Sequence, residues 1–270
     1  MVVQHNLSAM NTNRQMGVVT SALQKSTEKL SSGYKINRAG DDAAGLSISE
    51  KMRSQIRGLN KASDNAQDGI SLIQVAEGAL NETHSILQRM NELATQAAND
   101  TNTSVDRQSI KDEIEQLNEE LDRISTTTQF NKQDLLTGGF SGKLQVGALE
   151  GQTMDVKISL AVSANGLKVS AVEVSTNVKA GAAMQSIQDA IESVSKQRSK
   201  LGAIQNRLEH TINNLDTNAE NTQAAESRIR DTDMADEMVQ YSKNNILSQA
   251  GQSMLAQANQ QTQGVLSLLG

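Results

Sequence analysis

The sequence contains no cysteine, no proline and no tryptophan, and only two tyrosines and two phenylalanines. Without cysteine, no disulfide can stabilise the chain in any compartment. Without proline, nothing forces a long helix to kink or to stop. Aromatic side chains normally dominate the energetics of cores and interfaces, so leucine, isoleucine, valine, methionine and alanine must build any core. This composition favours long, narrow helical packing over a deep globular centre.

Further absences narrow the functional class. The segment 1–16 lacks the basic stretch and the apolar stretch of a cleavable signal peptide, so we expect any export to follow another route. No run of apolar residues approaches the roughly 18 that a membrane-spanning helix needs, so we expect no membrane insertion. The net charge of −6 disfavours nucleic acid as the main partner.

Two long heptad patterns dominate the sequence, one over residues 52–98 and the other over 187–229. In both, the seam positions alternate in steps of four and three residues, which is typical of a coiled coil. A shorter pattern of the same kind covers 110–124, and the polar segment 99–104 before it is typical of a loop that supplies helix N-caps. The short loop predicts that the helices over 52–98 and 110–124 are antiparallel neighbours. The helix over 187–229 completes a bundle with them.

The middle of the chain follows a different pattern. Apolar and polar residues alternate along 154–160 and 167–174, and Asn165-Gly166 is a strong hairpin turn signal, with Glu150-Gly151 a weaker one. We predict a small β region over 138–175 that caps one end of the bundle. The predicted fold class is therefore mainly α: a long antiparallel helical coiled-coil bundle with a small β-hairpin region inserted in the middle.

The two ends of the chain are almost free of charge. With His5 taken as neutral, the first charged residue is Arg14, and none follows Lys243. The C-terminal stretch 244–270 is too polar for a membrane core and too poor in charge for a solvated tail. We predict that the terminal segments build a core only together, across many copies of the chain. The candidate residues of this inner core are Leu23, Leu30, Ile246, Met254, Leu255, Leu268 and Leu269.

No arrangement of residues in the sequence indicates catalysis. His5, His84 and His210 stand in unrelated contexts, none beside a plausible nucleophile, and no nucleophile-elbow, phosphate-loop or dinucleotide-binding glycine pattern occurs. The acidic segment 231–237 faintly resembles a calcium loop, but Ala235 stands where an oxygen ligand belongs. Carboxylates at the start of a helix explain it better. We therefore expect no catalytic residue, no cofactor and no metal site.

Charge is distributed unevenly along the chain. Residues 1–58 carry an excess of lysine and arginine, and residues 209–239 carry a large excess of aspartate and glutamate. One interpretation is two solvated helix faces. The alternative is a basic belt on one copy that meets an acidic belt on the next and helps to set their register.

Three segments of the chain carry long and specific motifs. The first, LSSGYKINRAGDDAAGL over residues 30–46, resembles the signature near the N-terminus of a known family, the bacterial flagellins. Residues 201–208, LGAIQNRL, are similar to its C-terminal signature, and the closing stretch 250–270 is similar as well. The resemblance covers about residues 1–136 and 181–270, nearly everything except the β region.

The resemblance implies a division into two domains. Residues 1–45 with 232–270 are expected to form an inner domain of terminal helices that lies in the filament core. Residues 46–231, including 138–175, are expected to form the outer coiled-coil domain. The chain has no room for the additional surface domains of longer flagellins, so the filament should be comparatively smooth.

The resemblance also implies a function and partners. The chain is expected to be a structural subunit, not an enzyme, that assembles with many copies of itself into the extracellular flagellar filament for motility. It is expected to be exported unfolded through the flagellar secretion channel, escorted by an export chaperone and assembled beneath a filament cap. A host Toll-like flagellin receptor is a further expected partner.

The segment of this family that the host receptor reads matches residues 88–96, with Glu113 on the following helix. Leu93 lies on a stripe offset by two residues from the heptad seam, about 200° around the helix, and is expected to point away from the bundle. One interpretation is that Leu93 is an ordinary, isolated surface leucine. The other is that this stripe is a contact surface shared by the neighbouring subunit and the receptor. The candidate residues of this face are Gln88, Arg89, Glu92, Leu93, Gln96 and Glu113.

Two alternative functions remain open from the sequence. A hook–filament junction protein has terminal helices of the same type, but its family diverges in the 30–46 signature. A secreted coiled-coil effector or a pore-forming translocator is the second alternative, and the lack of a strongly apolar hairpin argues against the pore.

Overall fold

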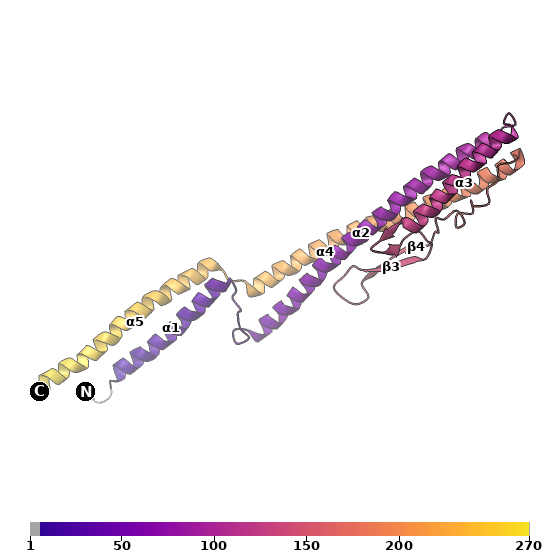
Figure 1. The fold of residues 1–270 in the computed structure, drawn as a ribbon. Coiled ribbons are helices and arrows are strands. Elements are labelled where there is room, and N and C mark those ends of the chain that lie inside the picture. The colour runs from indigo at the N-terminus through magenta and orange to yellow at the C-terminus, as the bar shows by residue number, and fades with distance from the viewer. Residues whose placement is uncertain (1–5, 270) are drawn as a thin grey trace. The chain divides into compact units, whose positions relative to one another are not determined.

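The structure, a computed structural model, describes residues 6–269, with the side chains of residues 6–261. The described part is mainly helical, as the sequence predicts (Figure 1). Two short antiparallel hairpins interrupt the helices in the middle of the chain, so the predicted fold class is confirmed. The helices are α1 (Leu7–Ser32), α2 (Ala43–Ala97), α3 (Ser104–Thr127), α4 (Asn177–Arg230) and α5 (Met234–Leu269).

The chain divides into two compact units, one of residues 1–54 with 221–270 and the other of residues 55–220. These divisions fall inside α2 and α4, so each of these helices contributes to both units. The domain boundaries expected from the resemblance, at residues 45/46 and 231/232, lie nearer the ends of the same helices and stay a prediction.

In the 55–220 unit, α2, α3 and α4 lie side by side (Figure 1). Every predicted seam position of α2 from 56 to 98 is buried or half-buried, and so is every seam position of α4 from 187 to 219. The Ser63 hydroxyl bonds Asp216 at 3.0 Å, and Arg198 lies 3.7 Å from Glu77. Positions that rise along α2 meet positions that fall along α4, so the two helices are antiparallel and the heptad prediction is confirmed.

A second row of buried residues runs along α2, beside the heptad seam. Its members are seven residues apart and mostly small: Ala62, Gly69, Ala76, Thr83, Met90 and Ala97. They are covered because α2 packs against α3 and the β region as well as against α4. The buried face of α2 is therefore wider than a two-helix seam requires.

Leu93 belongs to this widened face, which corrects the sequence-based expectation. Only 2% of its surface is exposed, and it lies in the same apolar core as Ile110 and Ile114 of α3. The prediction that Leu93 points away from the bundle is wrong, because a third helix lies on the side that a two-helix seam would leave open. Ile86, near it on α2, is half-buried against the same core.

The β region consists of two hairpins. Strands β1 (Gln129–Phe130) and β2 (Gln133–Asp134) follow α3 directly, and β3 (Phe140–Gln145) pairs with β4 (Thr153–Ile158). In β4 the predicted alternation is confirmed, since Met154, Val156 and Ile158 are buried and the residues between them are exposed. The β3–β4 connection contains Glu150-Gly151, with Gly151 at a φ of 82°, so the weaker turn signal marks the hairpin.

The stronger signal, Asn165-Gly166, does not connect two strands. The segment after β4 winds into successive turns, in which the Leu167 N–H donates to the Ser163 carbonyl and the Val169 N–H donates to the Ala164 carbonyl. Leu167 and Val169 are buried there without strand pairing. The predicted hairpin turn at Asn165-Gly166, with strand-like alternation over 167–174, is wrong, because packing on the helices buries these side chains and backbone bonds within the turns satisfy the segment.

The β3–β4 hairpin lies along the side of the helices and does not cap their end. The Asn65 side chain of α2 donates to the Gln145 carbonyl at 3.1 Å, and the Gln197 side chain of α4 donates to the Lys157 carbonyl at 3.4 Å. Both helices extend beyond these contacts in both directions.

None of the helices in the described part has the length and hydrophobicity that crossing a bilayer requires.

Candidate functional site

In the unit of residues 1–54 and 221–270, α1 and α5 form an antiparallel pair. The Asn6 side chain donates to the Ala258 carbonyl at 2.9 Å, and Lys29 lies 3.6 Å from Glu237. Each helix presents a row in steps of three and four residues that is half-buried or buried. The row on α1 is Ala9, Thr12, Met16, Val19, Leu23, Ser26 and Leu30, and that on α5 is Glu237, Tyr241, Asn244, Ser248, Gly251, Leu255 and Ala258.

This seam is only partly buried. Within the described part of the two helices, only Ser26 and Ala258 count as buried, at 5% and 8% exposed. Burial of apolar surface supplies most of the stability of packed helices, at about 25 cal/mol per Å². A seam with so little fully buried side-chain surface therefore holds the α1–α5 pair weakly, and helices without sufficient packing are marginal in water.

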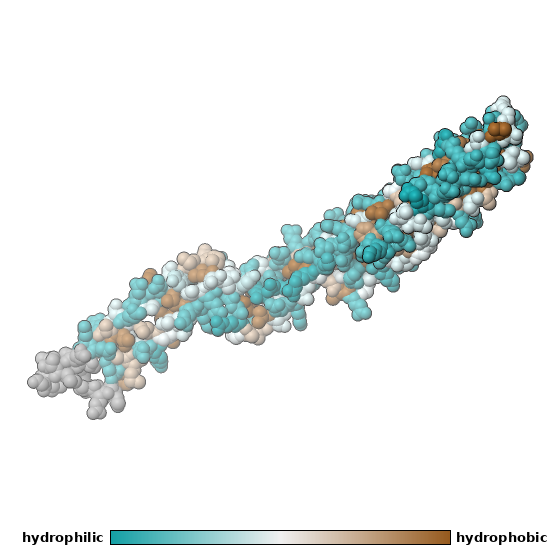
Figure 2. Space-filling view, viewed as in Figure 1, coloured by the Kyte–Doolittle hydropathy of each residue, from teal (hydrophilic) through white to brown (hydrophobic). Residues whose placement is uncertain are grey.

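Further large apolar side chains lie on the outside of the pair. Figure 2 shows apolar residues among polar ones on this surface. Ile246 is 67% exposed and Leu255 is half-buried in the seam; nine residues, about two and a half turns, separate them, so they point to opposite sides of α5. The exposed set on both helices is Leu7, Met10, Val18, Met234, Met238, Val239, Ile246, Leu247 and Met254.

The predicted inner-core residues thus divide into two groups. Leu23, Leu30 and Leu255 are half-buried and lie on the rows along which α1 and α5 face each other, whereas Ile246 and Met254 face outward. The side chains of Leu268 and Leu269 lie outside the described residues. In the sequence, Leu255 stands in the same uncharged stretch as Ile246 and Met254, and only the pairing of α1 with α5 separates them.

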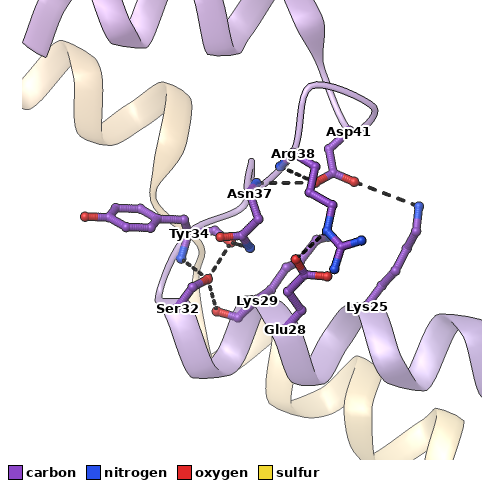
Figure 3. A network of polar contacts seen from close by, with 8 residues as sticks. All are labelled: Lys25, Glu28, Lys29, Ser32, Tyr34, Asn37, Arg38 and Asp41. Atoms are coloured by element: carbon purple, nitrogen blue, oxygen red, sulfur yellow. Dashed lines mark hydrogen bonds and ion pairs between the residues drawn. The ribbon is translucent and has the colours of Figure 1, made fainter.

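The connection from α1 to α2 contains most of the 30–46 signature. Gly33 ends α1 in a left-handed conformation, with a φ of 74°, and its N–H donates to the Lys29 carbonyl. The Ser32 hydroxyl accepts the Tyr34 N–H at 3.1 Å, and the Asn37 side chain donates to the Tyr34 carbonyl at 3.0 Å (Figure 3). The signature residues therefore hold one defined loop.

Asp41 organises the second half of this loop. One carboxylate oxygen accepts the Asn37 and Arg38 backbone N–H groups at 3.3 and 3.1 Å, and the other lies 3.9 Å from Lys25 (Figure 3). The Arg38 hydrogen bond first, then that of Asn37, lowers the pKa of Asp41 below its usual value. These bonds favour the charged carboxylate.

Acid should loosen this loop. Because the folded-state pKa of Asp41 is lowered, its stabilisation is complete above the ordinary carboxyl pKa of about 4. It is lost as the pH falls through the folded-state pKa. We expect Asp41→Ala to reduce the amide-exchange protection of Asn37 and Arg38 at pH 6, and the difference from the parent chain to vanish in acid. Asp64→Ala is the control, and parent protection factors that stay constant down to pH 2 would contradict the assignment.

The connection from α4 to α5 pairs with the same loop. Lys35 donates its N–H to the Arg230 carbonyl at 2.7 Å, and Thr232 donates its N–H to the Gly33 carbonyl at 3.0 Å. The Arg230 guanidinium lies 4.8 Å from the centre of the Tyr34 ring and bonds Glu50 at 2.8 Å. Sequence reasoning missed this contact, since nothing in the spacing of Tyr34 and Arg230 signals it.

The acidic segment 231–237 begins a helix, as predicted. The Asp233 carboxylate accepts the N–H groups of Ala235 and Asp236, and Asp236 and Glu237 lie in the first turn of α5. Carboxylates here complement the positive end of the helix dipole. Among the described residues, no cluster of three histidine or acidic side chains is placed to hold a metal ion.

Part of the charge asymmetry is satisfied within the chain. Lys29 pairs with Glu237, and Arg230 pairs with Glu50. The first pair joins a basic N-terminal residue to an acidic C-terminal one, whereas the second joins an arginine of the acidic region to a glutamate of the basic region. The complementary belts between copies stay a prediction.

The predicted receptor face lies on the other unit, where α2 meets α3. Arg89 donates to Glu113 at 3.0 Å and to Glu92 at 3.1 Å, and all three side chains are exposed. The Glu113 hydrogen bond is the main cause that raises the pKa of Arg89. Gln88 and Gln96 are exposed beside them. The structure brings five of the six predicted residues to one surface and places Leu93 in the core beneath.

A helix pair with a weak seam and outward apolar side chains is typical of a surface that packs against further protein. Comparison with known proteins identifies the family. Residues 3–141 match the bacterial flagellin N-terminal helical region, and residues 184–269 match the bacterial flagellin C-terminal helical region. The chain belongs to the bacterial flagellin family, which confirms the resemblance seen in its signatures.

Individual relatives agree with this assignment. Flagellin of Halalkalibacterium halodurans is 56% identical and flagellin of Bacillus subtilis 51% identical, each over 100% of both chains. The crystal structure of Bacillus cereus flagellin is 32% identical, covers 60% of this chain and 94% of its own, and superposes with a TM-score of 0.51. A putative flagellar hook-associated protein from Vibrio parahaemolyticus shares the fold, with a TM-score of 0.61 at 14% identity over 71% of this chain and 100% of that one.

Proposed function

We propose that this protein is the structural subunit of an extracellular flagellar filament and that α1 and α5 make its central contacts between copies. A relative that is 51% identical over the full length of both chains is the flagellar filament 31.3 kDa core protein of Treponema maltophilum. The observation that supports the proposal most directly is the outward apolar surface of α1 and α5. Ile246 and Val239, at 67% and 66% exposed, face away from the intramolecular seam.

The proposal predicts that a charge at this surface prevents polymerisation. We expect Ile246→Asp to raise the critical concentration for filament growth by about tenfold to a hundredfold, because an unpaired carboxylate would be buried between copies. Sedimentation of filaments from purified subunits measures this. Val178→Asp, at an 83% exposed valine of α4, is the matched control. Normal growth of the Ile246→Asp chain would show that this face of α5 makes no contact between copies.

The remaining partners follow from the same role. We infer that the chain acts structurally and not as an enzyme. Before export a chaperone covers the outward residues of α5. The chain is then exported unfolded through the flagellar channel and incorporated beneath a filament cap. A chaperone on α5 is supported by the same exposed residues that would otherwise associate in the cytoplasm before export.

The Arg89 face supports a second role, recognition of free subunits by a host Toll-like flagellin receptor. Arg89, Glu92 and Glu113 form an exposed charged network in which the arginine is held by two carboxylates. Charged surfaces of this kind contribute specificity and association rate. With Leu93 buried, the face consists of polar and charged residues, and we propose that the neighbouring subunit covers it in the filament.

Reversal of the charge of Arg89 tests this face. We expect Arg89→Glu to weaken receptor binding by dissociated subunits and to raise the critical concentration, each by about tenfold. Arg57→Glu, at another exposed arginine of α2, should change neither quantity. Loss of receptor binding with unchanged polymerisation would show that the two partners use different faces.

A hook–filament junction protein is the alternative function. The hook-associated likeness reaches only 14% identity and so shows the fold alone, whereas full-length identities of about one half connect the chain to flagellins. Labelled subunits along the whole filament length in electron micrographs would support the filament role. Label confined to the filament base would support the junction role.

A further inference from the structure

The methionines of the described residues are distributed unevenly by exposure. In the 55–220 unit, Met90 and Met154 are 0% and 8% exposed, and Met184 is half-buried. The described methionines that are largely exposed all lie on α1 and α5. We call these four residues the exposed methionines: Met10 at 65%, Met234 at 48%, Met238 at 50% and Met254 at 58%.

The exposed methionines lie toward both ends of the α1–α5 pair. Met10 is four residues after Asn6 and Met254 is four residues before Ala258, and the hydrogen bond between Asn6 and Ala258 places the two methionines at the same level of the antiparallel pair. Met234 and Met238 are four residues apart, on one side of α5, beside the Lys29–Glu237 contact. Contacts between copies through this surface would therefore bury thioethers at both ends.

A thioether is the one apolar side-chain group on this surface that mild oxidants attack. The sulfur lone pair attacks one oxygen of a peroxide; an S–O bond forms, the O–O bond breaks, and the leaving oxygen departs as water after proton transfer. The methionine becomes a sulfoxide, which is polar and chiral. A methionine sulfoxide reductase reverses the change with two electrons and two protons from a dithiol, releasing water.

We propose that the exposed methionines are an oxidation site that controls assembly: peroxide converts free subunits into a form that does not polymerise, and enzymatic reduction restores them. The inference rests on the proposed role of α1 and α5 as the contact between copies. A sulfoxide oxygen buried without a hydrogen-bond donor disfavours the contact by about tenfold in critical concentration. Leucine or isoleucine at these positions would give the same apolar contact without the sensitivity. In the filament the same sulfurs are covered and react slowly.

The test uses the full-length chain and hydrogen peroxide. Dissociated subunits are oxidised, peptide mass spectrometry follows each methionine, and sedimentation gives the critical concentration. We expect the exposed methionines to be oxidised while Met90 is protected, and the critical concentration to rise at least about tenfold. Assembled filaments treated in the same way should be oxidised more slowly at these four sites.

A variant with all four exposed methionines changed to leucine separates this site from other effects of peroxide. It should polymerise and keep its critical concentration after treatment. If the variant itself assembles poorly, reduction of oxidised parent subunits by methionine sulfoxide reductase gives the same information, since assembly should return. Normal assembly of fully oxidised parent subunits, or equal inhibition of the leucine variant, would overturn the proposal. Failure of untreated parent subunits to polymerise would instead contradict the proposed function.

Discussion

Removal of residues 244–270 is expected to abolish filament formation and to leave the unit of residues 55–220 folded. The truncation removes Ile246, Leu247 and Met254 from the outward surface and five of the seven seam residues that α5 offers to α1. It removes no member of the apolar core that joins α2, α3, α4 and the β region. The remaining chain should show a cooperative helical unfolding transition by circular dichroism and no sedimenting polymer.

The full-length chain, measured as dissociated subunits, is the control for the truncation. Its unfolding transition should have a similar midpoint, because the α1–α5 seam contributes little to the stability of a lone subunit. If the truncated chain still formed filaments, the assignment of α5 to the contact between copies would be wrong. If it lost its cooperative transition, α5 would be part of the core that folds first.

Leu93→Asp is expected to destabilise the 55–220 unit by about 4 kcal/mol or more. Loss of a buried leucine alone costs roughly 2–5 kcal/mol, and a carboxylate without a partner adds a desolvation penalty. Leu93 is 2% exposed and lies in one core with residues of α3, so solvent cannot reach the new charge without opening the helices. Urea denaturation followed by circular dichroism measures the change.

Gln96→Asp is the matched control, because Gln96 is exposed one turn further along α2. Such a surface substitution usually changes stability by less than about 0.5 kcal/mol. An unchanged unfolding midpoint for Leu93→Asp would mean that Leu93 faces solvent, contrary to its place in the core. Because Leu93→Asp is expected to destabilise the whole unit, it cannot test the receptor face, and Arg89→Glu takes that role.

The sequence alone determined the helices and their seams. A steady alternation of four and three residues puts apolar side chains on one line along a helix, and no proline or long glycine-rich segment interrupts it. The loop at 99–104 and the acidic start of α5 were also predictable, because helix ends need particular side chains next to their free backbone groups. The long signature at 30–46 was sufficient to indicate the family.

Only the tertiary structure decided which apolar residues are inside. Periodicity gives the angle of Leu93 around α2, but the number of elements packed around α2 depends on segments far away in the sequence. The same holds for α5, where Leu255 is half-buried and Ile246 is exposed. Both residues are aliphatic and stand in the same uncharged stretch. Their burial differs because α1 packs on only one side of α5.

The turn at Asn165-Gly166 and the contact between Arg230 and Tyr34 show the same limit. A turn signal gives the local backbone preference, but pairing of strands requires a second strand with free backbone groups. In this segment, hydrogen bonds within the turns satisfy the backbone groups, and the side chains pack on the helices. Arg230 reaches Tyr34 because two connections distant in sequence meet beside one helix pair. Local chemistry sets the elements of this protein, and the way the elements cover one another decides which of its surfaces is left for other copies.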